Sequence, residues 1–223
     1  MQLRRILSNR WMKVPVFALC LSPGLRLIWK GFNGGLGANP IEFITHSTGD
    51  WTLRFLAITL AVTPLRKRLR LPELVRFRRM LGLFAFSYAC LHFMTYLWLD
   101  KFFAWSEITK DVVKRPFITA GFTAFVLLIP LAITSTAGWI GRLGGKRWQM
   151  IHRLIYASAV AGVVHYYWLV KSDITRPAFY AAIVGLLLAY RAAIKLAGIS
   201  RTRPSAKPPG SLPVKETVLT LPG

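Results

Sequence analysis

Three histidines, His92, His152 and His165, lie within apolar stretches that are long enough to cross a lipid bilayer. An ionisable side chain is costly at that depth and usually has a partner. An imidazole in lipid can satisfy another polar group, relay a proton, or bind a metal or haem iron. The first hypothesis is therefore a buried metal centre, with a proton relay and a purely structural role as its alternatives.

The composition is that of an integral membrane protein. The chain has 223 residues, of which 54% are hydrophobic and 17% are charged, and its mean hydropathy is +0.43. The net charge is +22, but the basic residues cluster between apolar runs, so no nucleic-acid partner is expected. Cys20 and Cys90 lie in apolar stretches without a CxxC motif, so neither a disulfide framework nor thioether-attached haem is indicated.

Hydropathy predicts an all-α integral membrane protein, built as a six-transmembrane-helix bundle. The expected spans are approximately residues 14–29, 51–65, 80–99, 117–136, 150–170 and 177–197. This organisation gives an N-terminal segment at 1–13, a membrane domain at 14–197 and a disordered tail at 198–223.

The basic residues also predict the orientation of the chain. They concentrate in the N-terminal segment, in residues 66–79 and 142–147, and in the tail, whereas the intervening connections hold most of the acids. Because cytoplasmic loops carry an excess of Lys and Arg, both termini are expected in the cytoplasm. The chain is thus predicted to be a multi-pass protein of the bacterial inner membrane.

This topology decides which histidines can meet. Spans 80–99 and 150–170 run in the same direction, with His92 eight residues before Asp100 and His165 six before Lys171. At about 1.5 Å per residue, the depths of the two histidines differ by only roughly 3 Å. They can therefore face one another and hold a haem iron axially. By the same rise, His152 lies roughly 20 Å deeper and cannot bind the same iron.

Two features complicate this interpretation. On an ideal helix His152 and His165 lie roughly 140° apart, so either the helix is distorted between them or they have different surroundings. Nearby aromatic side chains could wall a porphyrin, but aromatic residues also fill bundle cores and interfacial belts. They are Phe86, Tyr88, Phe93, Tyr96, Tyr166, Tyr167 and Trp168.

The inner end of the third span carries Arg78 and Arg79 where a histidine could have paired with His152. Together with Arg147 and Trp148, they are candidate contacts for a haem propionate, a flavin phosphate or a quinone carbonyl. Anchoring to lipid phosphates at the cytoplasmic surface is their alternative role.

Four segments carry a family resemblance: GANPIEFITHSTGDW with TPLR within 37–66, RRMLGLFAFSYACLHFMTYLWLD at 78–100, KRPFITAG at 114–121, and ITSTAGWIGRLGGKRWQMIHRLIYASAVAGVVHYYW at 133–168. In these segments the chain resembles MsrQ, the haem-binding membrane subunits of periplasmic methionine sulfoxide reductase systems. That family is itself similar to the transmembrane part of ferric reductases and NADPH oxidases.

The resemblance implies axial ligation of haem b by His92, His165 and His152. An arginine at the fourth ligand position leaves open whether one haem or two are bound. It also implies an association with FMN, and electrons taken from the quinol pool or a cytoplasmic flavin reductase. Their acceptor would be a periplasmic molybdenum-containing methionine sulfoxide reductase subunit, where substrate reduction would occur. No GxGxxG-bearing domain follows the last span, so the donor is expected to be a lipid-soluble carrier or a separate protein.

Two alternatives from other classes remain at this point. A proton-coupled transporter predicts further intramembrane acids or broken helices, and a non-redox assembly subunit makes the histidines packing residues. Residues 31–50 and 100–115 are expected to be outer loops on which an acceptor could dock. His46, in the first of them, could contact the partner, tune electron exit or cap local structure.

Overall fold

Every regular element is helical in the computed structural model, which describes residues 2–136 and 138–201. The elements are α1 (Gln2–Ser8), η1 (Arg10–Met12), α2 (Lys13–Phe32), α3 (Pro40–Arg68), η2 (Pro72–Leu74), α4 (Val75–Met94), η3 (Thr95–Asp100), α5 (Trp105–Lys114), α6 (Pro116–Ile133), α7 (Trp139–Leu143), α8 (Gly145–His152), α9 (Leu154–Leu169) and α10 (Thr175–Arg201). The all-α prediction is confirmed for these residues.

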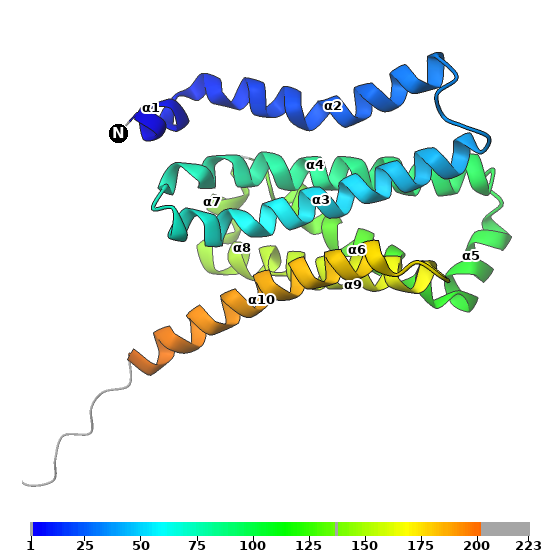
Figure 1. The fold of residues 1–223 in the computed structure, drawn as a ribbon. Coiled ribbons are helices and arrows are strands. Elements are labelled where there is room, and N and C mark those ends of the chain that lie inside the picture. The colour runs from blue at the N-terminus through cyan, green and yellow to red at the C-terminus, as the bar shows by residue number, and fades with distance from the viewer. Residues whose placement is uncertain (1, 137, 202–223) are drawn as a thin grey trace, which may run out of the picture.

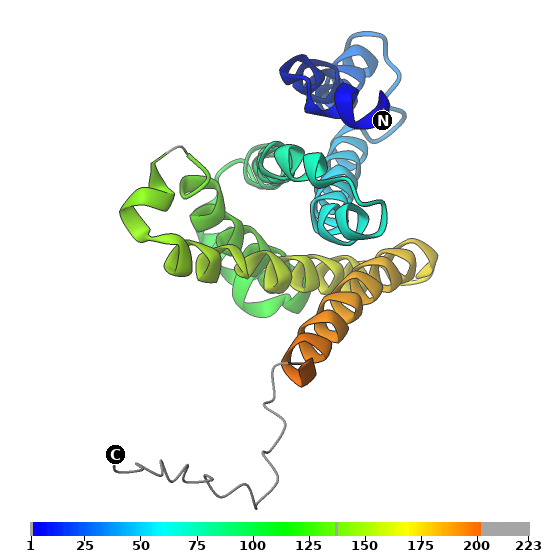
Figure 2. The ribbon, with the colours of Figure 1, turned by 90° about the vertical axis from the view of Figure 1, so that its left-hand side faces the viewer.

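Two helix pairs form the centre of the bundle (Figure 1). Helix α3 packs along α4, and α6 packs along α9, and these are the two most extensive helix contacts. Helix α10 packs against α9 and α3, whereas α2 lies on the outside against α3 and α4, as the turned view in Figure 2 shows. The space between the two pairs is therefore enclosed by α3, α4, α6 and α9.

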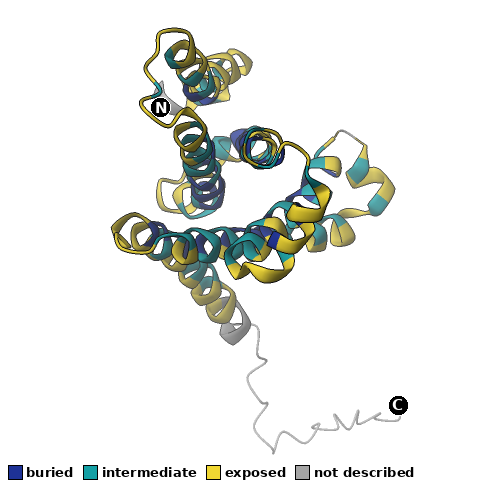
Figure 3. Cartoon of the chain, turned by 90° about the vertical axis from the view of Figure 1, so that its right-hand side faces the viewer, coloured by how far each residue is buried: buried dark blue, intermediate teal, exposed yellow. Residues whose placement is uncertain are grey.

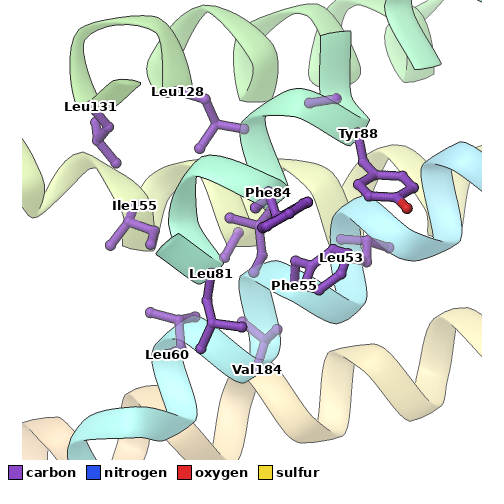
Figure 4. Close-up of a cluster of buried hydrophobic side chains, with 14 of the residues drawn as sticks. Leu53, Phe55, Leu60, Leu81, Phe84, Tyr88, Leu128, Leu131, Ile155 and Val184 are labelled. Atoms are coloured by element: carbon purple, nitrogen blue, oxygen red, sulfur yellow. The ribbon is translucent and has the colours of Figure 1, made fainter. Parts of the chain in front are cut away.

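The buried core is built from apolar side chains of six helices, α2, α3, α4, α6, α9 and α10, and Figure 4 shows part of it. Phe55 of α3 packs against Phe84 and Tyr88 of α4, with ring centroids 5.8 and 5.3 Å apart. Leu128 of α6, Ile155 of α9 and Val184 of α10 complete the cluster. In lipid such a core stabilises the bundle through close packing, since the lipid tails are as apolar as the side chains.

Interhelical hydrogen bonds also hold the helices together. Ser158 of α9 donates to the Ala124 carbonyl of α6 at 2.8 Å. Tyr88 of α4 donates to the Cys20 carbonyl of α2 at 3.2 Å. Arg191 of α10 donates to the Leu60 carbonyl of α3 at 2.9 Å. Each bond satisfies a polar group that would otherwise face an apolar interior.

Four helical segments among the described residues are long and apolar enough to cross a membrane: Arg10–Phe32, Pro72–Asp100, Pro116–Ile133 and Thr175–Ala197. Helix α3 carries Asp50 and Arg54 in its middle, and α9 has only 16 residues. The count of six spans therefore stays a prediction. Exposed residues cover much of the bundle's outer surface (Figure 3). Large apolar side chains are among them, including Leu19 and Trp29 of α2 and Leu186 of α10, and such side chains suit contact with lipid.

The prediction that residues 31–50 form a loop is wrong for their second half. Helix α3 begins at Pro40, behind an Asn39 cap whose side chain accepts a hydrogen bond from the Glu42 amide at 3.3 Å. Such a cap followed by proline is a strong helix start. Hydropathy missed this start because the first turns of α3 are rich in polar residues. His46 accordingly lies on a helix, 3.7 Å from the Glu42 carboxylate one turn earlier.

The fifth predicted span is interrupted. Helix α8 ends at His152, Arg153 forms a turn, and α9 begins at Leu154. Of the two alternatives left open by the angular offset between His152 and His165, a distorted helix or different surroundings, the distortion is present. It separates the short helix that carries His152 from the helix that carries His165.

Two further boundaries differ from the sequence expectation. The predicted loop at 100–115 contains the amphipathic helix α5, preceded by Phe102 and Phe103 with φ of 47° and 57°. At the other end, α10 extends to Arg201, beyond the expected end of the membrane domain at residue 197. The remainder of the predicted disordered tail, 202–223, lies outside the described residues.

Candidate metal centre

The imidazoles of His92 on α4 and His165 on α9 face one another between the two helix pairs. Their ring centroids lie 6.0 Å apart, and the ring planes make an angle of 75°. The depth match expected from the sequence is thus present in the structure. Proximity alone does not identify a ligand pair.

A backbone carbonyl of a neighbouring helix holds each imidazole through Nδ1. His92 Nδ1 lies 3.0 Å from the Thr45 carbonyl oxygen of α3, and His165 Nδ1 lies 2.6 Å from the Phe117 carbonyl oxygen of α6. Because a carbonyl can only accept, Nδ1 of each ring carries the proton and Nε2 keeps its lone pair. Most metal-binding histidines are oriented in this way, by a hydrogen bond from the ring nitrogen that does not bind the metal.

The spacing of the two rings suits one metal ion between them. Two metal–imidazole bonds of about 2.0 Å each would place the two Nε2 atoms about 4 Å apart. The centroid separation of 6.0 Å exceeds the length of these two bonds, so one metal can fit between the rings. Both rings can therefore reach one metal without a large movement.

The ligand set indicates what kind of metal centre fits. No group of three or more His, Cys, Asp or Glu side chains converges within the described part of the chain. Two imidazoles are fewer ligands than a bare structural ion normally uses. A metal that arrives with its own equatorial nitrogens, as in a porphyrin, needs only the two axial positions.

A cavity of about 920 Å³ surrounds the two histidines and is lined by α3, α4, α5, α6 and α9. Its volume is that of a site for a sizeable organic ligand. Leu56, Ala89 and Leu128 line it at one end. The charged lining residues come from the N-terminal half of α3, the end of η3 and the residue before α6, and they are Glu42, His46, Asp50, Asp100 and Arg115. The cavity is therefore apolar at the end lined by Leu56, Ala89 and Leu128, its deep end. It is polar at the end next to α5, its outer end.

Only some of the aromatic residues near the histidines line this cavity. Phe93, Tyr96 and Tyr166 do, together with Trp105, Phe117, Phe122 and Phe125, which the sequence analysis had not selected. Tyr88 points into the core cluster instead (Figure 4), where its hydroxyl bonds α2. Phe86, Tyr167 and Trp168 are not among the lining residues. Sequence position alone could not separate these groups, because the direction of each side chain depends on helix rotation.

An ion-pair network fastens α5 across the outer end of the cavity. Asp111 of α5 lies 2.9 Å from Lys101 Nζ and 3.1 Å from Arg115 Nε, and the Tyr96 hydroxyl donates to it at 3.3 Å. The hydrogen bond from Lys101 holds the pKa of the Asp111 carboxyl below its ordinary value. Through Asp111, the network connects Lys101, just after η3, to Arg115, just before α6.

The Asp111→Asn variant is expected to loosen α5. It removes the charge from two ion pairs around a side chain that is only 12% exposed, which should lower the local opening free energy by roughly 1–2 kcal/mol. Faster backbone hydrogen exchange in α5 would report the change. Glu107→Gln is the matched control, because Glu107 is 65% exposed and reaches Lys101 only at 4.0 Å.

The stability that the ion pairs of Asp111 give to α5 has a defined pH dependence. A carboxyl whose pKa is lowered by folding contributes stability above its unfolded pKa, about 3.9 for Asp, and loses it as the pH falls through the lowered value. After correction for the intrinsic rate, exchange in wild-type α5 should stay flat from neutral pH to about pH 4. A rise that begins near pH 6 would contradict the assignment to Asp111.

His152 lies apart from the cavity, on α8 at the end of the bundle opposite α5 (Figure 1). Its Nε2 is 3.1 Å from the Thr134 hydroxyl, and its ring stacks on Trp148 with centroids 3.9 Å apart. Arg78 lies within electrostatic range of His152. Arg79 and Arg147 are exposed. The structure thus brings together three of the predicted inner residues, His152, Trp148 and Arg78, and leaves the other two at the surface.

The class of protein that this fold and site define is a transmembrane component of the ferric reductase type. The family model described as "Ferric reductase like transmembrane component" matches residues 48–163. The match includes His92 and His152 and ends just before His165. A chain that matches this model over half its length, and that carries several helices apolar enough to cross a membrane, is a multi-pass membrane protein of this class.

Full-length relatives narrow the family further. The chain is 59% identical to the "Protein-methionine-sulfoxide reductase heme-binding subunit MsrQ" of Herminiimonas arsenicoxydans, over 80% of this chain and 83% of the relative. It is 50% identical to MsrQ of Azospira oryzae over 91% and 87% of the two chains, and 48% identical to MsrQ of Caulobacter vibrioides over 79% and 84%. The chain belongs to the MsrQ family. The resemblance drawn from the four sequence segments is confirmed.

Proposed function

We propose that this chain is a haem b membrane electron-transfer subunit that passes electrons across the bacterial inner membrane to a periplasmic methionine sulfoxide reductase catalytic subunit. Such a role would support the repair of oxidised periplasmic proteins. The observation that carries the proposal is the facing pair His92 and His165, each with Nδ1 on a carbonyl, which leaves the lone pair of Nε2 free for ligation. The printed name of the relatives, a heme-binding subunit, supports the same proposal.

The residues present fit a haem at this site. His92 and His165 would hold the iron through Nε2, and the walls from α3, α4, α6 and α9 would enclose the porphyrin. Haem propionates are carboxylates, which a guanidinium binds well. Arg115 at the polar outer end of the cavity is therefore the residue that would receive them.

Bound haem supplies a reversible one-electron oxidation and reduction of its iron. The protein's contribution is to hold two neutral imidazoles in place, because the Thr45 and Phe117 carbonyls fix their tautomer and raise their basicity. The apolar residues Leu56, Ala89 and Leu128 exclude water from the deep end, and burial of this kind tunes a haem potential.

Electron entry is proposed at the inner ends of α4 and α8. His152 would be an axial ligand of a second haem if one is bound. Arg78, Arg79, Arg147 and Trp148 would contact a haem propionate, the phosphate of FMN or a quinone. The half-buried cluster of His152, Trp148 and Arg78 supports a cofactor contact, and the exposure of Arg79 and Arg147 suits contact with a flavin reductase or lipid phosphates. The electron donor would be the quinol pool or a cytoplasmic flavin reductase.

The proposed topology has six spans within residues 14–197, with segment 1–13 and the tail from 198 in the cytoplasm. The N-terminus and the far end of α10 lie at the same end of the bundle, opposite α5 (Figure 1). An even number of crossings requires this arrangement. The opposite end, with α5 and the start of α3, would face the molybdenum-containing periplasmic partner.

Absorption spectroscopy tests the proposal directly. Purified protein is expected to show Soret and α bands that shift on reduction by dithionite, and pyridine haemochrome quantification should give one or two haems b per chain. The physiological electron donor should produce the same shift. The two donors to compare are a reduced quinone analogue and a flavin reductase with FMN and NADH. A fully folded but colourless preparation would sink the proposal, and it would favour an assembly or transport role.

A further inference from the structure

Two glycines lie directly against the two facing imidazoles. A Cβ atom on Gly49 of α3 would lie 3.0 Å from Cε1 and 3.1 Å from Nδ1 of His92. A Cβ atom on Gly121 of α6 would lie 2.7 Å from Nδ1 and 2.9 Å from Cε1 of His165. Real Cβ atoms essentially never approach a heavy atom closer than 3.0 Å. A Cβ atom at Gly121 would therefore force a shift of the His165 ring, and one at Gly49 would require the His92 ring to give by a few tenths of an ångström.

The two glycines occupy equivalent positions in the two helix pairs. Gly49 follows Thr45 by four residues, and Gly121 follows Phe117 by four residues. Four residues make about one helical turn. Each ring thus lies over a glycine of the neighbouring helix. Its Nδ1 donates to the carbonyl of the residue one turn before that glycine. The pairs α3–α4 and α6–α9 build two half-sites of the same design.

We propose that Gly49 and Gly121 are positioning residues of the metal centre. Each seats one imidazole so that Nδ1 reaches its carbonyl and Nε2 points toward the opposite ring. The inference deepens the proposed function and rests on it for its haem-based measurements. A binding constellation must be held within about 0.5 Å of its productive geometry. A methyl group beneath either ring would displace that ring by a comparable amount and reduce the space between the two imidazoles.

Helix propensity does not account for these glycines. Alanine is a better helix former than glycine, so a Gly→Ala change inside a helix should stabilise the helix unless the new methyl group meets an obstacle. Two other helical glycines show the contrast. A Cβ atom on Gly82 of α4 meets nothing closer than 3.8 Å, and one on Gly185 of α10 has nothing within 4 Å.

The two half-sites differ in how tightly they fit. At Gly121 two of the three nearest atoms lie below 3.0 Å, and all three belong to the His165 ring. At Gly49 the nearest atom of His92 lies at 3.0 Å and the third at 3.6 Å. Gly121→Ala should therefore disturb its histidine more than Gly49→Ala does.

The experiment compares Gly49→Ala and Gly121→Ala with Gly82→Ala and Gly185→Ala in the full chain. Haem per chain, the ferric low-spin electron paramagnetic resonance spectrum and the midpoint potential are measured, with circular dichroism and gel filtration as checks of folding. Retention of haem should weaken about 10- to 100-fold in Gly121→Ala, as for loss of a partner that orients a metal ligand. Gly49→Ala should keep more haem but with an altered spectrum and potential, and both controls should match wild type.

A second measurement does not depend on haem. Nitrogen NMR of the histidine rings in haem-free protein reports the tautomer, and Gly121→Ala should change the signal of His165 alone. Full haem content with unchanged spectra in both glycine variants would overturn the positioning role. So would unchanged ring signals of His92 and His165 in the variants of their respective glycines. Wild-type protein that never binds haem would instead overturn the proposed function, while the ring signals would still decide the role of the glycines. If Gly121→Ala fails to fold, Gly49→Ala carries the same test.

Discussion

The replacement of His92 or His165 by alanine should abolish haem binding between the two helix pairs. In the proposed function each histidine would supply one of two axial ligands, in a cavity where no third His, Cys, Asp or Glu converges with them within the described part of the chain. Removal of a partner that merely orients a ligand already costs about 10- to 100-fold in metal affinity, so loss of the ligand itself should cost more. Pyridine haemochrome quantification of each purified variant measures the effect.

The matched controls are Leu91→Ala and Val160→Ala. Both residues lie on the same helices as the histidines, and both side chains are substantially exposed, at 50% and 44%. They should leave haem content unchanged. If both histidine variants keep wild-type haem content and potential, the iron is bound elsewhere and the assignment of the facing pair is wrong.

The His152→Ala variant should produce the opposite pattern, with the outer haem retained and electron entry from the cytoplasmic side strongly slowed. His152 does not line the cavity and lies on the short helix α8, separated by the turn at Arg153 from the helix that carries His165. Loss of a carrier at this depth would leave a gap that electrons cross slowly. The measurement combines haem content with the rate of haem reduction by quinol or by flavin reductase with FMN.

Gln149→Ala is the control for this variant, because Gln149 is an exposed residue of the same short helix α8. It should change neither haem content nor reduction rate. Loss of all haem in His152→Ala would show that the depth assignment is wrong. An unchanged reduction rate would remove His152 from the electron path and leave its hydrogen bond to Thr134 as its role.

The sequence located the helical class and most helix positions well, but it placed helix ends less accurately. Apolar runs are visible in the sequence because lipid requires them over a whole span. The start of α3 was missed because its polar first turns line a cavity rather than face lipid. The sequence did contain a signal for this start, the Asn39–Pro40 pair, which is typical of a helix N-terminus.

The pairing of His92 with His165 could also be predicted, because it depends only on topology and on a constant rise per residue. The amphipathic helix α5 and its Asp111 network could not be predicted by that reasoning. They depend on contacts between residues such as Tyr96 and Asp111, which come together only when a loop folds back over the bundle.

Residue types, apolar lengths and charge bias were sufficient for the sequence to determine a helical membrane chain, its family, and two histidines at one depth. Only the tertiary structure decided which atom of each imidazole is available to a metal. That choice belongs to the Thr45 and Phe117 carbonyls and to the space above Gly49 and Gly121. Every residue carries a carbonyl, so its role depends on helix rotation and packing, which no side-chain pattern records.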